Sequence, residues 1–302
     1  GSLAPGEDLM VDPKIRQFTV LCSMPGELRR GARSEWSRYA LDGRKLDGFL
    51  EGPVMGPDGT LYMTDIPFGR ILSFAPTGSW SVVAEYDGWP NGMKLSDAGF
   101  LVADHKRGLL EIGREGSVRV IVDGFEGAPF HGLNDLTVAH NGDIWFTDQG
   151  MSGLDAPFGR LFRYSNGLLT MAMGGIPSPN GLVFSEDETV IYLAVTRDNA
   201  IWRLPLGEDG NIRKAGRFIQ LSGGVGPDGL ARGPDGDLMV VHAGLGVWRF
   251  GANGLPRTFW HDPDFTYPTN LAADPRKPGW YLVTESLTCS VLCVGLTDGE
   301  AG

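Results

Sequence analysis

Six side chains that carry a carboxylate or a carboxamide recur through this chain at nearly even steps. Each begins a short apolar run, and successive members lie 40 to 48 residues apart: Glu51, Asn91, Asn134, Asn180, Asp228 and Asn270. Carboxylate and amide oxygens are the ligands that hard cations such as Ca²⁺ and Mg²⁺ prefer. Two carboxylates would also balance the charge of one divalent ion. The set predicts a single cation site, provided that the fold brings these distant positions together.

The spacing of these residues indicates the elements that must position them. A repeat of this length is typical of a propeller or a solenoid. After each polar residue comes an apolar run, then a turn rich in Gly, Asn, Asp or Pro, then further β-like runs, as at 144–148, 159–164 and 168–172 of the third repeat. The sixth repeat ends after its third strand, and a spare β-like run, 18–22, precedes the first repeat. A strand from the N-terminus would close the last blade and remove an open sheet edge.

We therefore predict an all-β fold: a six-bladed β-propeller with four-stranded blades, its ring closed by an N-terminal strand. One domain is expected over residues 1–302, with the closing strand and a connector in 1–45 and six blades in 46–296. No segment shows a sustained apolar period of 3.6 residues, so helices should be scarce. The polar, Arg-rich stretch 24–49 is interpreted as a connector that could hold one helical turn.

The bulk composition narrows the partners. The 302 residues carry a net charge of −11, with a pI of about 4.9, which argues against nucleic acid or an anionic membrane surface. No apolar run approaches the ~20 residues that a membrane span needs. Cys22, Cys289 and Cys293 lack the spacing of a disulfide framework, which fits inert thiols in a reducing compartment. We expect a cytoplasmic monomer or weak homo-oligomer, although the leading Gly1-Ser2 leaves open a removed export signal.

Propeller geometry places a second set of polar residues beside the first. The first strand of each blade lines the axial channel, and the hairpin returns the end of the second strand to the same mouth. The second set comprises Asp104, His105, Asp148, Thr196, His242 and Glu285. Within the two sets, we expect substrate contacts from Asn91, Asn134, Asn270, His105 and His242.

Four of the motifs resemble the metal-site motifs of the gluconolactonase, regucalcin and senescence-marker-protein family. In order, they are Glu51-Gly-Pro-Val, Leu133-Asn134-Asp135, Pro179-Asn180-Gly181-Leu182 and Pro227-Asp228-Gly229-Leu230. The resemblance covers roughly residues 45–296 and implies a metal-dependent lactonase. It implies that Glu51, Asn180 and Asp228 ligate one divalent cation, foremost Ca²⁺, with Mg²⁺, Mn²⁺ and Zn²⁺ as other candidates. Asn134 is similar to an asparagine that ligates the metal in some members and contacts substrate in others.

Such a site supports hydrolysis of a lactone to a hydroxy acid, because a cation polarises the acyl oxygen and stabilises the oxyanion. Asp228 is the candidate base, ligating with one oxygen and accepting a proton with the other. Alternatively, the cation acidifies the water, and His131 or His242 takes its proton. His131 precedes the Asn-Asp pair, where sugar lactonases of the family tend to have arginine, so the substrate need not be a sugar lactone.

Three other functions remain open at this point. Organophosphate hydrolases of the diisopropyl fluorophosphatase and paraoxonase type resemble this plan and also hold Ca²⁺. A non-catalytic calcium-binding propeller would carry the same ring of oxygens. A propeller similar to strictosidine synthase would need a glutamate and no metal, which the nearly complete set of oxygen donors disfavours.

Overall fold

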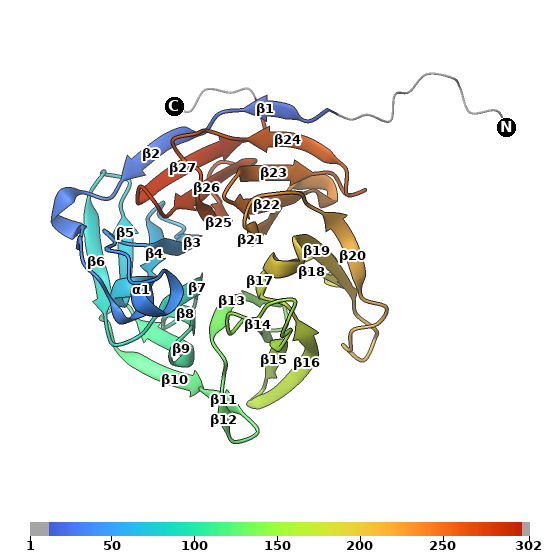
Figure 1. The fold of residues 1–302 in the computed structure, drawn as a ribbon. Coiled ribbons are helices and arrows are strands. Elements are labelled where there is room, and N and C mark those ends of the chain that lie inside the picture. Colours follow the sequence, from blue (N-terminus) through green and yellow to red (C-terminus); the bar gives the residue numbers. More distant parts are fainter. Residues whose placement is uncertain (1–11, 298–302) are drawn as a thin grey trace.

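A computed structural model describes residues 12–297, in which six blades, each built on four antiparallel strands, surround a central axis (Figure 1). In blades 1 to 4 the strands are arranged outward from the axis in chain order, and in blades 5 and 6 the outermost strand comes from the N-terminal segment. The predicted six-bladed propeller is confirmed. The predicted domain spans 1–302, of which residues 1–11 and 298–302 lie outside the described part.

The blades have the following bounds. Blade 1 is β3 (Leu50–Met55), β4 (Leu61–Asp65), β5 (Arg70–Phe74) and β6 (Trp80–Glu85), and blade 2 is β7 (Pro90–Leu95), β8 (Gly99–Asp104), β9 (Gly108–Gly113) and β10 (Val118–Val122). Blade 3 is β13 (Leu133–Val138), β14 (Ile144–Asp148), β15 (Gly159–Ser165) and β16 (Leu168–Ile176), and blade 4 is β17 (Pro179–Phe184), β18 (Val190–Val195), β19 (Ala200–Pro205) and β20 (Gly216–Gln220). Blade 5 is β21 (Gly226–Arg232), β22 (Leu238–Ala243), β23 (Gly246–Phe250) and β24 (Pro256–Trp260), and blade 6 contains β25 (Pro268–Ala273), β26 (Trp280–Glu285) and β27 (Ser290–Gly295). Between blades 2 and 3 lies a small hairpin, β11 (Gly124–Phe125) and β12 (Ala128–Pro129).

The N-terminal segment closes the ring, as predicted. Strand β2 (Thr19–Ser23) pairs antiparallel with β27 and supplies the fourth strand of blade 6. A strand that the sequence did not reveal, β1 (Lys14–Arg16), pairs parallel with β24 and adds a fifth strand to blade 5. Two consecutive strands therefore hold blades 5 and 6 from outside, which leaves fewer backbone groups on their outer edges unpaired.

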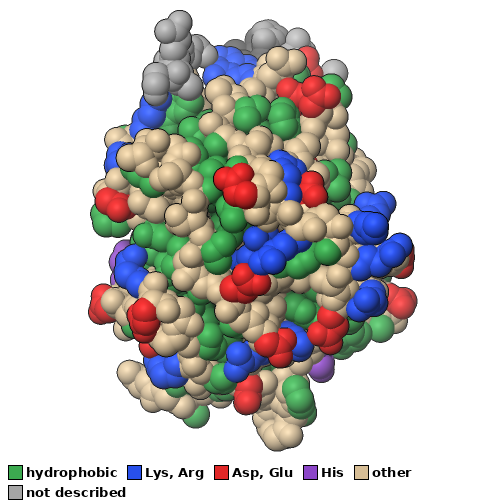
Figure 2. Space-filling view, turned by 90° about the vertical axis from the view of Figure 1, so that its left-hand side faces the viewer, with side chains coloured by type: hydrophobic (Ala, Val, Ile, Leu, Met, Phe, Trp, Pro, Cys, Tyr) green, Lys and Arg blue, Asp and Glu red, His purple; other side chains and the backbone are tan. Residues whose placement is uncertain are grey.

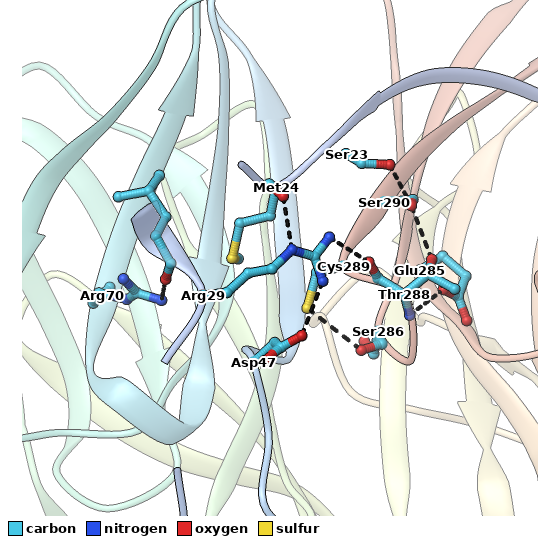
Figure 3. A network of polar contacts seen from close by, with 11 residues as sticks. Ser23, Met24, Arg29, Asp47, Arg70, Glu285, Ser286, Thr288, Cys289 and Ser290 are labelled. Atoms are coloured by element: carbon cyan, nitrogen blue, oxygen red, sulfur yellow. Dashed lines mark hydrogen bonds and ion pairs between the residues drawn. The ribbon is translucent and has the colours of Figure 1, made fainter. Parts of the chain in front are cut away.

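The connector between β2 and β3 is held against blades 1 and 6. It contains η1 (Gly26–Leu28) and one short helix, α1 (Glu35–Ala40), whose start is capped reciprocally by Ser34 and Ser37. Arg29 fixes the segment, because its guanidinium donates to the Met24 carbonyl at 2.9 Å, to Asp47 and to the Thr288 carbonyl, both at 3.0 Å (Figure 3). The remaining helices are single 3-10 turns: η2 (Ile66–Phe68), η3 (Thr196–Asp198) and η4 (Pro234–Gly236).

The apolar core is divided into six parts, each between the faces of two neighbouring blades. Between blades 1 and 2, for example, Ile71 packs with Met93, Phe100 and Val102, all fully buried. Packing of this kind stabilises the ring without filling the axis. The axis is therefore free to hold polar side chains.

The outer surface mixes both signs of charge. On the face shown in Figure 2, Lys and Arg side chains alternate with Asp and Glu, without a broad area of one sign. No helix in residues 12–297 is long and apolar enough to cross a bilayer.

Candidate active site

The six polar residues that begin the first strands sit at bulges. In blades 1 to 5 the pairing of the first with the second strand shifts register at or just after this residue, as between Glu51 and Val54, and in blade 6 it shifts just before Asn270. A bulge places an extra residue on one strand and redirects its side chain. The repeated bulge is thus the local feature that sets these side chains apart from the regular alternation of the strand.

Glycines beside these residues let the first strands crowd around the axis. A Cβ atom at Gly92 would collide with Asp135 of the next blade, and one at Gly229 would collide with Asn270. Gly181 is equally close to the backbone of β21. Only glycine allows so close an approach, which brings the polar side chains of neighbouring blades together.

A cavity of about 230 Å³ lies at this end of the axis. Five of the six repeated residues line it: Glu51, Asn91, Asn134, Asn180 and Asp228. The walls combine polar and apolar side chains, and the apolar ones come from the connector and from several blades: Trp36, Ala40, Leu41, Phe49, Ile66, Met151, Val225, Ala243 and Tyr267. The cavity is smaller than the roughly 300–1,000 Å³ of pockets for drug-sized ligands, so it suits a small molecule.

Four oxygens in the cavity are buried and have no hydrogen-bond partner among the described residues. They are the Oδ1 atoms of Asn91, Asn134, Asn180 and Asp228. Two of the amide groups are oriented by their nitrogens, since Asn134 donates to Gln149 at 3.2 Å and Asn180 to Thr196 at 3.3 Å. An unsatisfied buried oxygen costs about 1–3 kcal/mol, so four of them together call for a ligand that accepts lone pairs. A hard cation meets that requirement.

The charges around the cavity favour the same ligand. Burial raises the pKa of Glu51 to about 7, and the charge of Asp135 adds to the rise. Burial likewise raises the pKa of Asp228 well above its ordinary value, with further contributions from Glu51 and Asp135. The pKa of Asp135 is also raised by burial, and Lys94 offsets part of this. Three carboxyl groups thus share a low-dielectric centre in which a divalent cation would neutralise two charges.

The donor set is rich in amides rather than in acidic groups. Within residues 12–297, no three His, Cys, Asp or Glu side chains are grouped so as to hold a metal. The ring offers two carboxylates, Glu51 and Asp228, and completes its oxygens with carboxamides. Such a set fits Ca²⁺ or Mg²⁺ better than a metal that prefers nitrogen or sulfur.

The sixth repeated residue, Asn270, is turned away from the cavity. Its amide nitrogen donates to Glu51 at 3.0 Å and to Asp135 at 3.1 Å, and its oxygen accepts from the Leu271 amide at 2.8 Å. All its side-chain polar atoms are engaged, and it does not line the cavity. The structure therefore does not bring Asn270 to the position of a substrate contact, and gives it the role of linking two buried carboxylates.

Asp135 belongs to the site although sequence reasoning missed it. It follows Asn134 at a position where four of the other five blades have glycine after the repeated residue. The signal was therefore present as a departure from the repeat. Its carboxylate accepts from Asn270 and from the Leu136 amide at 2.8 Å, and its charge acts on both Glu51 and Asp228.

Of the three histidines predicted for the site, His105 lines the cavity. Its Nδ1 atom donates to the Leu133 carbonyl at 3.0 Å, which leaves Nε2 as an acceptor 3.4 Å from the hydroxyl of Tyr39. Trp89 and Tyr39 stack on each other beside the imidazole. Burial lowers the pKa of His105 to about 4, so the ring is neutral at physiological pH.

The other two histidines are placed differently. Both ring nitrogens of His242 are occupied, because Nδ1 accepts from Trp248 at 3.2 Å and Nε2 donates to the Gly223 carbonyl at 2.9 Å. The side chain of His131 is 41% exposed, with Nδ1 3.9 Å from Asp148. Neither histidine is among the residues that line the cavity. The predicted substrate contact of His242 and the catalytic role of His131 therefore have no support in this geometry.

The acidic residues at the ends of the second strands hold the entrances of the first strands. Asp104 pairs with Pro90 across the sheet, and its carboxylate accepts from the Trp89 amide at 3.1 Å. The equivalent carboxylates accept from the loop amides of blades 1, 3 and 6: Asp65 from Phe49, Asp148 from Gly132 and Glu285 from Tyr267. They lie at the same mouth, but as supports of the ring.

A larger hollow, of about 640 Å³, lies at the opposite ends of the strands among the hairpin turns of blades 4 to 6. Its buried carboxylate, Asp237, is already paired with Arg249 at 2.7 Å. Among the described residues, it lacks the group of unsatisfied oxygens that distinguishes the axial cavity.

Comparison with known proteins identifies the family of the chain. Residues 49–277 match the family model described as the SMP-30/gluconolactonase/LRE-like region, which covers most of the chain and all four motifs on which the resemblance was based. The chain belongs to the SMP-30/gluconolactonase/LRE-like family. The resemblance inferred from the motifs is thereby confirmed.

Relatives in this family include lactonases. The gluconolactonase of Zymomonas mobilis is 30% identical over 242 residues, covering 68% of this chain and 67% of that protein. The pentonolactonase XacC of Haloferax volcanii is 29% identical over 262 residues, covering 83% and 84%. Among solved structures, the calcium-binding protein regucalcin of Agrobacterium tumefaciens shares the fold with a TM-score of 0.74 at 20% identity, covering 93% of this chain and 95% of that one.

Proposed function

We propose that this protein is a metal-dependent lactonase, which opens a cyclic ester to a hydroxy acid. The observation that carries the proposal is the group of four buried Oδ1 atoms, unpartnered among the described residues, that face one small cavity together with Glu51. The two lactonases among the relatives support the reaction class.

The residues that would hold the cation are Glu51, Asn134, Asn180 and Asp228. Their oxygens suit Ca²⁺ first, with Mg²⁺, Mn²⁺ and Zn²⁺ as further candidates. When bound, such a cation supplies Lewis-acid polarisation of an acyl oxygen and stabilises negative charge on it. Regucalcin of Agrobacterium tumefaciens, which shares the fold, is a calcium-binding protein, and this is consistent with the choice of Ca²⁺.

The chain's own residues would orient the substrate and accept a proton. The Oδ1 atom of Asn91 is free to contact a bound lactone from the cavity wall. A carboxylate oxygen of Asp228 is the first candidate to take the proton from the attacking water, and Nε2 of His105 is the second. We assign no proton transfer to His131 or His242, because neither lines the cavity.

The decisive experiment combines metal removal with substitution of Asp228. Hydrolysis of D-glucono-1,5-lactone should disappear on exhaustive chelation and return with Ca²⁺. Asp228→Asn should lower kcat/KM by on the order of 10²–10³-fold or more with the circular dichroism spectrum unchanged, because the inter-blade cores do not involve this residue. Asp97→Asn, a change on the exposed surface, is the matched control and should be fully active.

Other outcomes would redirect the proposal. Undiminished activity in the chelated protein would rule out the metal mechanism. Faster turnover of paraoxon than of any lactone would favour an organophosphate hydrolase. Binding of Ca²⁺ without turnover of lactones or paraoxon would leave a calcium-binding protein.

A further inference from the structure

One side chain on the cavity wall has no role in the lactonase proposed above. Arg197, in the single turn η3 after β18, is the one arginine or lysine among the described residues that line the cavity. Its side chain is exposed, and within residues 12–297 it forms no side-chain hydrogen bond or ion pair. In a protein of net charge −11, the guanidinium of this arginine is therefore available to bind a ligand that enters the cavity.

The turn that carries Arg197 is itself well fixed. Thr196 donates to the Pro227 carbonyl at 2.8 Å, and Asn199 ends the turn in the left-handed region with its side chain bound to the Gly223 carbonyl. The neighbouring acid, Asp198, is taken by Arg217 and by the indole of Trp202, both at 2.7 Å. The turn thus fixes the backbone of Arg197, while the adjacent carboxylate of Asp198 is bound by other side chains.

Arg197 is not the counter-ion of the buried carboxyl groups. The main influences on the pKa of Glu51 and Asp228 are burial and their acidic neighbours, and Arg197 is not among the principal contributors. Its charge acts instead near Tyr267: burial raises the pKa of that hydroxyl, Asp228 adds to the rise, and Arg197 and Arg44 oppose it. The positive charge of Arg197 is therefore felt at the cavity wall rather than at the axial carboxylates.

We propose that Arg197 binds a carboxylate on the substrate, at a position remote from the acyl group that is hydrolysed. The substrate class is then a lactone that retains a second, ionised carboxyl group, and this inference rests on the function proposed above. A planar guanidinium pairs with a carboxylate through two parallel hydrogen bonds, which gives direction as well as attraction. The cavity volume of about 230 Å³ limits the substrate to a small molecule, so ring and carboxylate would lie between the axial oxygens and Arg197.

The reaction on such a substrate is a simple hydrolysis. The oxygen of water forms a bond to the acyl carbon, and the bond from that carbon to the ring oxygen breaks. The ring oxygen takes up a proton and becomes a hydroxyl, and the new carboxylic acid loses its proton at neutral pH. The product is a hydroxy dicarboxylate, and one proton is released per turnover, which a pH indicator records.

A matched pair of lactones tests the proposal. D-glucaro-1,4-lactone and D-glucono-1,4-lactone share the ring and differ at C6, where the first has a carboxylate and the second a hydroxymethyl group. We expect a roughly 10–100-fold higher kcat/KM for the glucarolactone, the range given by a charged hydrogen bond. Arg197→Met should abolish this preference mainly through KM, leaving the gluconolactone within about two-fold of wild type. Arg197→Lys should restore it in part, because lysine keeps the charge and lacks the planar fork.

The control variant is Arg203→Met, which removes an exposed arginine of the same blade that does not line the cavity. It should behave as wild type on both lactones. Equal losses on both lactones in Arg197→Met, or a wild type that prefers the neutral lactone, would overturn the proposal. If wild type hydrolyses neither lactone, the proposed function fails first, and calorimetry with D-glucarate and D-gluconate then decides. Tighter binding of glucarate that Arg197→Met removes would support the carboxylate site, and equal binding would refute it.

Discussion

Two sets of buried acidic and amide groups lie at the same end of this propeller, and they differ in how their oxygens are used. At the ends of the second strands, Asp65, Asp104 and Asp148 each accept at least two hydrogen bonds or ion pairs from the protein. On the axis, Asn134, Asn180 and Asp228 each keep an oxygen with no partner among residues 12–297. The two sets lie on the same hairpins, one strand apart.

Whether a buried oxygen already has a hydrogen-bond partner distinguishes structural residues from candidate functional ones better than residue type does. Aspartate at the end of a second strand is a support, since the loop amides and arginines that it binds fix the entry of the first strand. Aspartate or asparagine one strand further in is held by its blade, while its oxygen stays open to a ligand. A buried oxygen without a hydrogen-bond partner destabilises a fold. Such oxygens are therefore retained where a ligand supplies the missing contact.

The largest effect on stability is expected in the outer set. Asp65→Ala would leave the guanidinium of Arg70, which is 1% exposed, with no acidic partner, and would free the Phe49 amide. Loss of one member of a buried ion pair costs about 3–5 kcal/mol. Urea denaturation should therefore show a markedly lower free energy of unfolding. Asp209→Ala, which breaks the exposed pair with Arg213, is the control and should unfold with wild type. Similar urea midpoints for Asp65→Ala and Asp209→Ala would show that the buried carboxylate at the end of the second strand does not support the fold.

A smaller and pH-dependent effect is expected on blade 2, where Asp104 supports the loop and the adjacent His105 faces the cavity. Burial lowers the pKa of His105 from 6.5 to about 4, against the opposing effects of the Leu133 carbonyl and Asp148. Between these values the unfolded chain binds the proton and the folded one does not, so stability falls as the pH drops from about 6.5 to about 4. This corresponds to at most about 3 kcal/mol.

His105→Gln tests this sign. The difference in unfolding free energy between wild type and variant should change in favour of the variant as the pH falls through that window, and level off below it. Comparing the two proteins cancels the titration of other groups, including His242, whose pKa burial also lowers. Parallel curves from pH 7 to pH 4 would show that His105 is protonated as readily in the folded protein as in the unfolded one.

The sequence predicted the features that recur in every blade, and it did not predict side-chain orientations that depend on contacts between blades. The period of 40 to 48 residues gave the blades, the axial positions of Asn134, Asn180 and Asp228, and a closing strand at 18–22 that the structure places at Thr19–Ser23. The blades and the axial positions follow from one blade repeated six times, and the closing strand follows from the missing fourth strand of the sixth repeat. The orientation of Asn270 away from the cavity could not be predicted in this way, because it depends on Glu51 and Asp135 of two other blades.

The histidines illustrate the same limit. His105 and His242 both lie at the end of a second strand in sequence, and only packing distinguishes them: His105 is held by Leu133 and Tyr39, whereas both ring nitrogens of His242 are occupied by Trp248 and Gly223. The detailed structure of the connector could not be predicted either, because α1 has only six residues and no apolar period. Two of its residues, Trp36 and Ala40, nevertheless line the cavity.

The last expectation concerns the axial set itself and is the smallest in free energy. A cation that binds only the folded protein stabilises it by about 2.7 kcal/mol at one hundred times its dissociation constant. Adding Ca²⁺ to the chelated protein should therefore raise the melting temperature, whereas NaCl at equal ionic strength should not. In Asp228→Asn the gain should be lost, because one of two axial carboxylates is gone. The same variant should melt above wild type when both are free of metal, since burial and the charges of Glu51 and Asp135 disfavour the ionised carboxylate at this position. Asp97→Asn should keep the full gain. An equal rise in melting temperature on adding Ca²⁺ in wild type and Asp228→Asn would place the cation elsewhere. The unpartnered axial oxygens would then be a destabilising consequence of packing and not a binding site.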